Sequence, residues 1–194
     1  MTSSAPSSPT VLMVPGLGNS GPGHWQSLWE NNRNDCCRAE LGNWDTPGKG
    51  DWVDRLDKAI ARMSGPVVLV AHSLGCHAVA WWAATGATAR TGKVIGALLV
   101  APPDVDDDPA IPAIAGFGPT PKNRLPFPSV LAASRNDPYI RFEQARMLAD
   151  RWGSAFEDVG VAGHINAASG LGSWPFGQAL LIKLIDAVQS KPAE

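Results

Sequence analysis

Ser73 has the sequence surroundings that point most directly to chemistry. It lies in Ala71-His72-Ser73-Leu74-Gly75, between an apolar run and a helical pattern. This strand–turn–helix setting is typical of a nucleophile elbow, in which a sharp turn exposes the serine hydroxyl and small residues are required two positions on either side. Ala71 and Gly75 meet that requirement. The alternative interpretation is an ordinary turn with a serine near the N-cap of a helix.

A serine nucleophile needs a base whose pKa lies near neutrality, and histidine is the usual one. The chain has four histidines. We expect His72 to point away from Ser73, and His77 to lie inside a helix packed on the sheet. His24 is expected to open the first helix and to line a pocket. His164 is the favoured base, because the glycines around it suit a loop that presents a ring at a fixed angle.

The carboxylate that orients the histidine is expected to be Asp137, which follows an apolar run and gives the chain order Ser, Asp, His. Its Asp-Pro pair also fits a simple turn. Asp104 and the run at residues 106–108 follow an earlier apolar run and are rival candidates. Three adjacent carboxylates would repel one another if they were buried, so the run is typical of a solvated loop.

The glycine-rich loop at residues 15–21 is expected to face the serine. Acyl transfer needs N–H donors for the developing oxyanion. We assign them to the backbone N–H groups of Leu17 and Leu74, with Gly16 letting the chain turn inward. A dinucleotide- or phosphate-binding loop is the alternative, but the loop lacks the Gly-Lys-Ser/Thr ending. No metal-binding spacing of His and Cys is found, so we expect neither a metal nor a cofactor.

The elements that must position these residues follow from the alternation of patterns along the chain. Runs that are apolar on both faces predict central strands of a parallel sheet, at residues 11–14, 67–71, 94–100 and 129–133. Weaker strands are predicted at residues 36–40 and 155–159. Helices are predicted at residues 51–63, 77–84, 142–152 and 176–188. This alternation predicts an α/β fold whose chemistry lies at the carboxyl ends of the strands.

Length and composition restrict the classes of protein further. The 194 residues fit a single domain, expected at residues 10–190 after a disordered tail at residues 1–9. The net charge of −2 and the lack of a basic stripe argue against nucleic acid as a partner. The apolar runs are too short to span a membrane. The absence of a secretory signal and the three cysteines, two of them adjacent, favour a cytoplasmic protein.

The chain has eight tryptophans. Trp81, Trp82 and Trp152 fall in helical patterns and are expected in the core. Trp25, Trp44 and Trp174 lie in or beside glycine-rich loops, where they either line an apolar acyl pocket or cover small core clusters. The sequence alone leaves that choice open.

Short motifs along nearly the whole chain form a pattern that is more specific than any one of them. They are Val14-Pro15-Gly16, His24-Trp25, Trp52 with Leu56, His72 to Cys76, Ala101 to Asp104, Ser134-x-x-Asp137-Pro138, Gly163 to Asn166, and Gly172-x-Trp174-Pro175. The pattern resembles the retinoblastoma-binding-protein-nine-like small serine hydrolases of the α/β-hydrolase superfamily. The resemblance implies a triad of Ser73, Asp137 and His164. It also implies a compact, mostly parallel sheet flanked by helices on both faces, without a cap domain.

The expected activity is hydrolysis of a small ester, thioester or amide through an acyl-enzyme intermediate, with a small-molecule acyl substrate. Without a cap domain, the pocket should be shaped by residues 18–25 and 102–128, which favours short acyl chains. Acyl transfer by the same triad is one alternative. Another is a protein-binding module that keeps the fold, although no Leu-x-Cys-x-Glu docking string is present and the sequence leaves any protein partner unknown.

Overall fold

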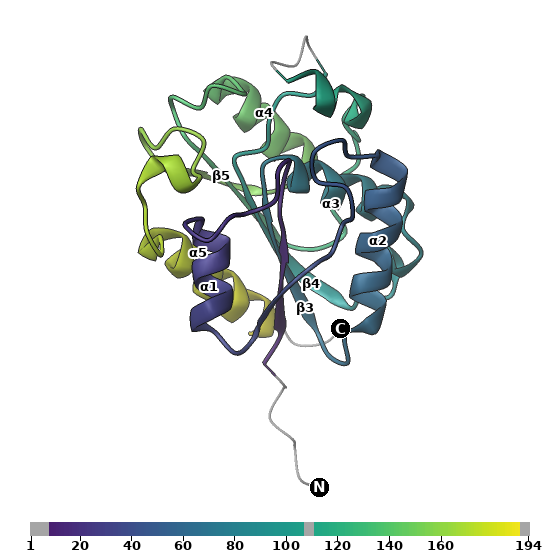
Figure 1. Ribbon diagram of the computed structural model, residues 1–194. Coiled ribbons are helices and arrows are strands. Elements are labelled where there is room, and N and C mark those ends of the chain that lie inside the picture. Colours follow the sequence, from purple (N-terminus) through teal and green to yellow (C-terminus); the bar gives the residue numbers. More distant parts are fainter. Residues whose placement is uncertain (1–7, 107–110, 191–194) are drawn as a thin grey trace, which may run out of the picture.

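The computed structural model describes residues 8–106 and 111–190 (Figure 1). The tail predicted at residues 1–9 therefore falls largely outside the described residues. Six strands form one sheet: β1 (Thr10–Val14), β2 (Cys36–Arg38), β3 (Val67–His72), β4 (Val94–Val100), β5 (Ser129–Ala133) and β6 (Ala155–Asp158). All neighbouring strands are parallel, in the order β2-β1-β3-β4-β5-β6. The predicted parallel sheet is confirmed.

The sheet is covered on both faces, which explains why its central strands are apolar throughout. The helices are α1 (Trp25–Asn32), α2 (Lys49–Arg62), α3 (Leu74–Thr85), α4 (Phe142–Trp152) and α5 (Pro175–Gln189). Figure 1 shows α1 and α5 together on one side of the sheet, with α2 and α3 on the other. Along β1, Leu12 and Val14 pack toward α2, α3 and α4, whereas Val11 and Met13 pack toward α1 and α5. This alternation follows from the two-residue period of a strand.

The strand order places the ends of β1 and β3 side by side, although β2 and α2 lie between them in the sequence. The chain leaves β1 toward β2 on one side, then returns to β3 on the other side of β1. Such a switch in direction opens a crevice at the carboxyl ends of the two strands, which is where α/β proteins bind ligands. The loop after β1 and the turn containing Ser73 meet at this crevice.

The predicted elements are found with shifted ends. Helix α3 begins at Leu74 instead of residue 77, because the turn at Ser73 leads directly into it. Between β4 and β5 the described residues form only a short 3₁₀ helix, Pro112–Phe117, so this region holds no cap domain. Within the described chain, no helix has the length and hydrophobicity needed to cross a bilayer.

Candidate active site

Ser73 occupies a sharp turn between β3 and α3, with φ 54° and ψ −128°. A positive φ is rare and strained for residues other than glycine. Strained backbone of this kind is characteristic of functional turns. The neighbouring strand explains why Gly75 must be glycine. A Cβ at this position would lie 2.2 Å from the carbonyl oxygen of Val14. Ala71, two residues before the serine, is fully buried in β3, where its methyl group fits.

The loop that follows β1 passes directly against the serine turn. A Cβ on Gly16 would lie 2.8 Å from the Cβ of Ser73 and 3.0 Å from the backbone nitrogen of Leu74. Only glycine permits this approach without displacing the turn. Gly16 therefore acts by bringing the loop close, and the next residue, Leu17, lies at the edge of the cavity above Ser73.

A continuous set of hydrogen bonds joins Ser73, His164 and Asp137. The Nε2 atom of His164 lies 2.9 Å from Ser73 Oγ. On the other side of the ring, Nδ1 lies 2.9 Å and 3.0 Å from the two carboxylate oxygens of Asp137. The side chains of His164 and Asp137 are only 9% and 1% exposed. In a neutral ring, Nδ1–H donates to Asp137 and Nε2 accepts the Ser73 hydroxyl proton, which is the arrangement that activates a serine.

Tyr139 contacts both Asp137 and His164, and the sequence patterns did not single it out. Its backbone N–H donates a 3.0 Å hydrogen bond to Asp137 Oδ1. Its ring packs edge-on against the His164 ring, with centroids 4.6 Å apart and planes at 80°. The Asp137-Pro138-Tyr139 turn thus fixes the carboxylate and supports the imidazole. An Asp-Pro turn is the one signal in the sequence that could have suggested this.

Two buried hydrogen-bond donors, one from β3 and one from α1, hold the loop that carries His164. The Nε2–H of His72 donates to the carbonyl oxygen of His164 at 2.9 Å. The indole N–H of Trp25 donates to the next carbonyl, that of Ile165, at 2.8 Å. Ile165 has a φ of 48°, which is unusual for a β-branched residue. Two consecutive peptide units of this strained loop are therefore fixed to β3 and α1.

His72 and His24 form a buried imidazole pair beneath the site, with ring centroids 4.6 Å apart. Burial lowers the pKa of His72 well below its usual value, and the charges of its histidine neighbours lower it further. Burial and the nearby Arg38 lower the pKa of His24 to about 4. Both rings are therefore neutral at neutral pH, so neither competes with His164 by holding a positive charge.

A cavity of about 440 Å³ opens above Ser73 and His164. Besides these two, it is lined by Leu17, Asn19, Gly21, His24, His72, Ile111, Tyr139, Asn166, Ala167 and Ala168. The expected contribution of residues 18–25 is thus visible in Asn19, Gly21 and His24. From residues 102–128, Ile111 is the one described residue that lines it. Asn166 to Ala168 form a third wall that the sequence patterns did not predict.

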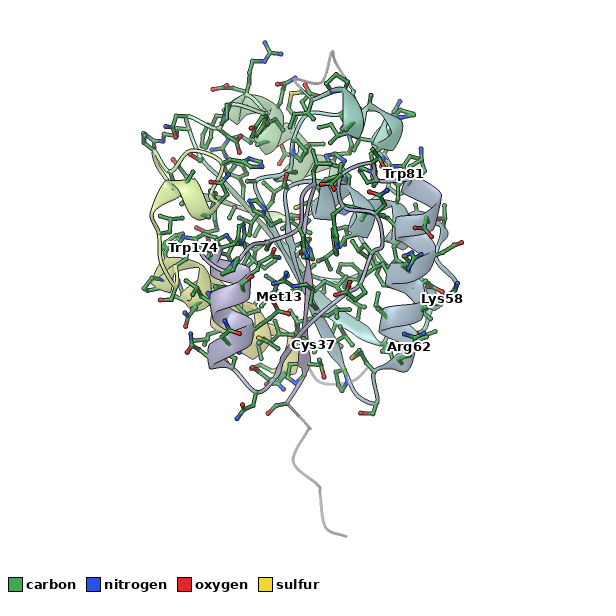
Figure 2. The ribbon with its side chains drawn as sticks, in the orientation of Figure 1. Met13, Cys37, Lys58, Arg62, Trp81 and Trp174 are labelled. Carbon is green, nitrogen blue, oxygen red and sulfur yellow. The ribbon has the colours of Figure 1, made fainter. Side chains whose placement is uncertain are left out.

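None of the three loop tryptophans lines this cavity. Trp25 and Trp174 are almost fully buried and pack against Trp29 in the core between the sheet and α1 and α5. Trp44 packs against Trp52 on the opposite face of the sheet. Figure 2 shows Trp174 beside α1, far from the labelled Trp81 near α2. Of the two alternatives that the sequence leaves open for these tryptophans, the contacts favour core packing, which buries their large apolar surface.

Asp104, Asp106 and His77 lie outside the cavity above Ser73. Asp104 accepts a hydrogen bond from Gln144, and Asp106 accepts from Thr120, whereas Asp107 and Asp108 lie outside the described residues. His77 is fully buried in α3 and donates to the carbonyl oxygen of Pro103 at 2.8 Å.

A larger depression of about 880 Å³ lies beyond Tyr139. Its walls carry arginine and carboxylate side chains in similar numbers, but neither Ser73 nor His164. The described residues contain no group of three His, Cys, Asp or Glu side chains placed to hold a metal ion.

Comparison with known proteins agrees with this fold. The parallel sheet, its flanking helices and the serine turn at the end of a central strand define an α/β-hydrolase. A family model described as Serine hydrolase matches residues 11–183, and the chain belongs to this family. No curated protein gives a significant match.

Solved structures show the same fold over almost the whole chain. A YdeN-like hydrolase from Pectobacterium atrosepticum has 30% sequence identity and a TM-score of 0.81, covering 92% of this chain and 91% of that one. The ydeN gene product of Bacillus subtilis has 19% identity and a TM-score of 0.71, covering 92% and 99%. An N-formylmaleamic acid deformylase from Pseudomonas putida has 15% identity and a TM-score of 0.67, covering 89% and 93%.

Proposed function

We propose that this serine hydrolase acts through Ser73 as nucleophile, His164 as general base and acid, and Asp137 as the carboxylate that orients His164. The observation that carries the proposal is the unbroken set of hydrogen bonds from Ser73 Oγ through both nitrogens of His164 to Asp137. These residues lie on three separate loops, yet they meet at one edge of the sheet.

In the first step, Ser73 Oγ bonds to the acyl carbon of the substrate while His164 Nε2 takes the hydroxyl proton. The bond to the leaving group then breaks as His164 returns that proton to it, and an acyl-serine remains. In the second step, His164 removes a proton from water, whose oxygen attacks the acyl carbon. The bond to Ser73 breaks, the serine regains a proton and the acid product leaves.

The oxyanion formed in each step is assigned to the N–H groups of Leu17 and Leu74. Leu74 is the first residue of α3, where a backbone N–H has no acceptor within the helix. In the described part of the chain, no hydrogen bond is made by the Leu17 N–H. Gly16 brings this loop against the serine turn, which supports a paired donor site.

For the substrate, we propose a small ester, thioester or amide with a short acyl chain. The cavity above Ser73 is modest in size, and its apolar walls come from short or branched side chains, Leu17, Ile111, Ala167 and Ala168. Esters with short acyl chains are therefore expected to react faster than those with long ones. Within the family, the sequence motifs favour the retinoblastoma-binding-protein-nine-like branch.

A fluorophosphonate probe tests the nucleophile directly, because it phosphonylates an activated serine. Ser73→Ala should abolish both labelling and hydrolysis of 4-nitrophenyl butanoate, with thermal stability nearly unchanged. The matched control is Ser173→Ala, which removes an exposed hydroxyl outside the cavity and should keep both. Labelling that persists in Ser73→Ala would show that another residue is the nucleophile.

A further inference from the structure

Arg38 joins β2 and α1 to the loop that follows β1. It is the last residue of β2, and its side chain is 16% exposed. Its Nε and Nη2 groups donate to one carboxylate oxygen of Glu30, and Nη2 also donates to Ser27 Oγ at 2.7 Å. Its Nη1 group donates to Asn19 Oδ1 at 2.8 Å and to the carbonyl oxygen of Ser20 at 2.9 Å. One guanidinium thus holds two consecutive residues of this loop.

The ion pair with Glu30 explains only part of this arrangement. A guanidinium carries its N–H groups in one rigid plane, so fixing one edge of the plane fixes the direction of the other edge. The edge that meets Glu30 balances the charge of that carboxylate. The Nη1 group is directed by the same plane, and both of its hydrogen bonds go to the loop. A lysine would balance the charge but would lack this second, fixed set of donors.

Asn19, one of the two loop residues held by Arg38, closes the turn that contains the proposed oxyanion donor Leu17. The backbone N–H of Asn19 donates to the carbonyl oxygen of Gly16 at 3.1 Å, so that Leu17 and Gly18 lie within the turn. Asn19 has a φ of 61°, which is uncommon for a residue other than glycine. Such a conformation persists where surrounding contacts hold it, and the Arg38 guanidinium supplies one of those contacts.

The turn that Asn19 closes lies directly against the nucleophile. Its first residue, Gly16, approaches Ser73 so closely that a Cβ would lie 2.8 Å from the serine Cβ. Leu17 and Asn19 line the same cavity as Ser73. An oxyanion donor acts only when its N–H points at the developing charge, so a small displacement of the turn is costly for the reaction. The contacts of Arg38 therefore bear on the geometry of the reaction.

We propose that Arg38 is a positioning residue, whose hydrogen bonds to the loop after β1 keep the Leu17 N–H directed at the oxyanion. This rests on the proposed function and adds to it a residue outside the Ser73 cavity. Arg33 provides the comparison, because it also lies close to β2 and forms an ion pair. In the described chain, the side-chain hydrogen bonds of Arg33 go to Asp35, which is not part of the loop.

Three variants separate the loop contacts from the charge of Arg38. Arg38→Lys keeps a positive charge beside Glu30 but loses the rigid set of donors. Asn19→Gly removes the acceptor, tolerates the positive φ and leaves the Glu30–Arg38 pair in place. The third variant combines both changes. Arg33→Lys is the matched control, because it makes the same substitution in another partly buried, ion-paired arginine.

Two measurements report on position without depending on how much of each variant is folded. The first is kcat for 4-nitrophenyl butanoate, expressed per serine titrated with fluorophosphonate. The second is the inhibition constant of 1,1,1-trifluoro-4-phenylbutan-2-one. Ser73 Oγ bonds to its carbonyl carbon, the hydroxyl proton passes to His164 Nε2, and the electron pair of the broken C–O π bond leaves a hemiketal oxyanion. The ketone therefore measures oxyanion stabilisation without turnover.

Arg38→Lys should lower kcat per titrated serine by roughly tenfold or more, with KM nearly unchanged, and should raise the inhibition constant of the ketone by a similar factor. Asn19→Gly should also lower kcat and weaken the ketone. Because both changes remove the same contact, the loss in the double variant should be smaller than the product of the two single losses. Arg33→Lys should keep the native values.

Native kcat in Arg38→Lys, or a lower kcat with unchanged inhibition by the ketone, would overturn the proposal. Losses that multiply in the double variant, or an equal loss in Arg33→Lys, would overturn it as well. If Arg38→Lys does not fold, Asn19→Gly decides the matter, because native kcat and ketone inhibition in that variant would contradict a role for the Arg38–Asn19 contact. If the native protein neither reacts with fluorophosphonate nor hydrolyses the ester, the proposed function itself fails.

Discussion

The imidazole of His72 donates a 2.9 Å hydrogen bond to the main-chain carbonyl of His164. The residue just before the nucleophile thus holds the loop that carries the base, and the two rings lie 5.0 Å apart. Because Ser73 follows His72 directly, one short segment fixes both ends of the Ser73–His164 hydrogen bond. The sequence predicts only that the His72 side chain points away from Ser73.

Loss of the His72 donor should impair catalysis through position. In His72→Leu the His164 carbonyl loses its partner, and a small displacement of the base should lower kcat by roughly 10- to 100-fold with little change in KM. His72→Gln keeps an N–H donor and should recover part of kcat. Steady-state kinetics on one ester measure kcat and KM separately. A rise in KM with unchanged kcat would contradict a positioning role.

Asp137→Asn tests the carboxylate. An asparagine amide at this position favours the wrong tautomer of His164 and cannot stabilise its cation, so kcat should fall by roughly 10⁴-fold. The fold should survive, since the side chain keeps its size. Asp106→Asn is the control, because Asp106 bonds Thr120 and lies outside the Ser73 cavity. A larger loss of kcat in Asp106→Asn than in Asp137→Asn would reverse the assignment.

Much of the fold and of the candidate active site could be predicted from the sequence, because both depend on local patterns. The two-sided apolar runs indicate buried parallel strands, and Ser73, Asp137 and His164 each follow a predicted strand. Parallel strands bring their carboxyl ends to one edge, so order along the chain is enough to propose that the three meet.

The roles that the sequence does not predict depend on backbone contacts or on packing between distant segments. Tyr139 acts through its N–H and the face it offers to His164, and Trp25 acts through an indole N–H that meets a carbonyl 140 residues away. No periodicity encodes such pairings. The sequence leaves the location of Trp174 open, because a tryptophan in a loop suits a pocket and a core equally well until the packing is known.

Gly75→Ala tests the geometry of the elbow. Its Cβ would meet the Val14 carbonyl oxygen at 2.2 Å, so β1 and α3 must separate. We expect a loss of about 1–3 kcal/mol or more in the free energy of unfolding, with weakened activity. Gly50→Ala is the control, because its Cβ meets nothing within 4 Å and alanine favours the helix α2. Urea denaturation measures the free energy of unfolding of both variants. Equal values for the two would contradict the predicted clash.

The buried histidines predict how stability depends on pH. Burial lowers the pKa of His24 and of His77 to about 4, from 6.5 in an unfolded chain. Between these values the unfolded state binds more protons than the native state, so acid favours unfolding. Their full contribution is present above about pH 6.5 and is lost as pH falls toward about 4, on the order of 3 kcal/mol for each ring.

The unfolding free energy should therefore decline steeply through this range, before most carboxylates titrate. His77→Gln is the variant that separates this effect from general acid denaturation. Glutamine can still donate to the Pro103 carbonyl, but it does not titrate, so its stability curve should fall less steeply between about pH 6.5 and 4. The absolute stability of the variant does not matter for this comparison, because the slope with pH reports the difference in bound protons. Parallel curves for the native protein and His77→Gln would show that His77 is not held neutral by its burial.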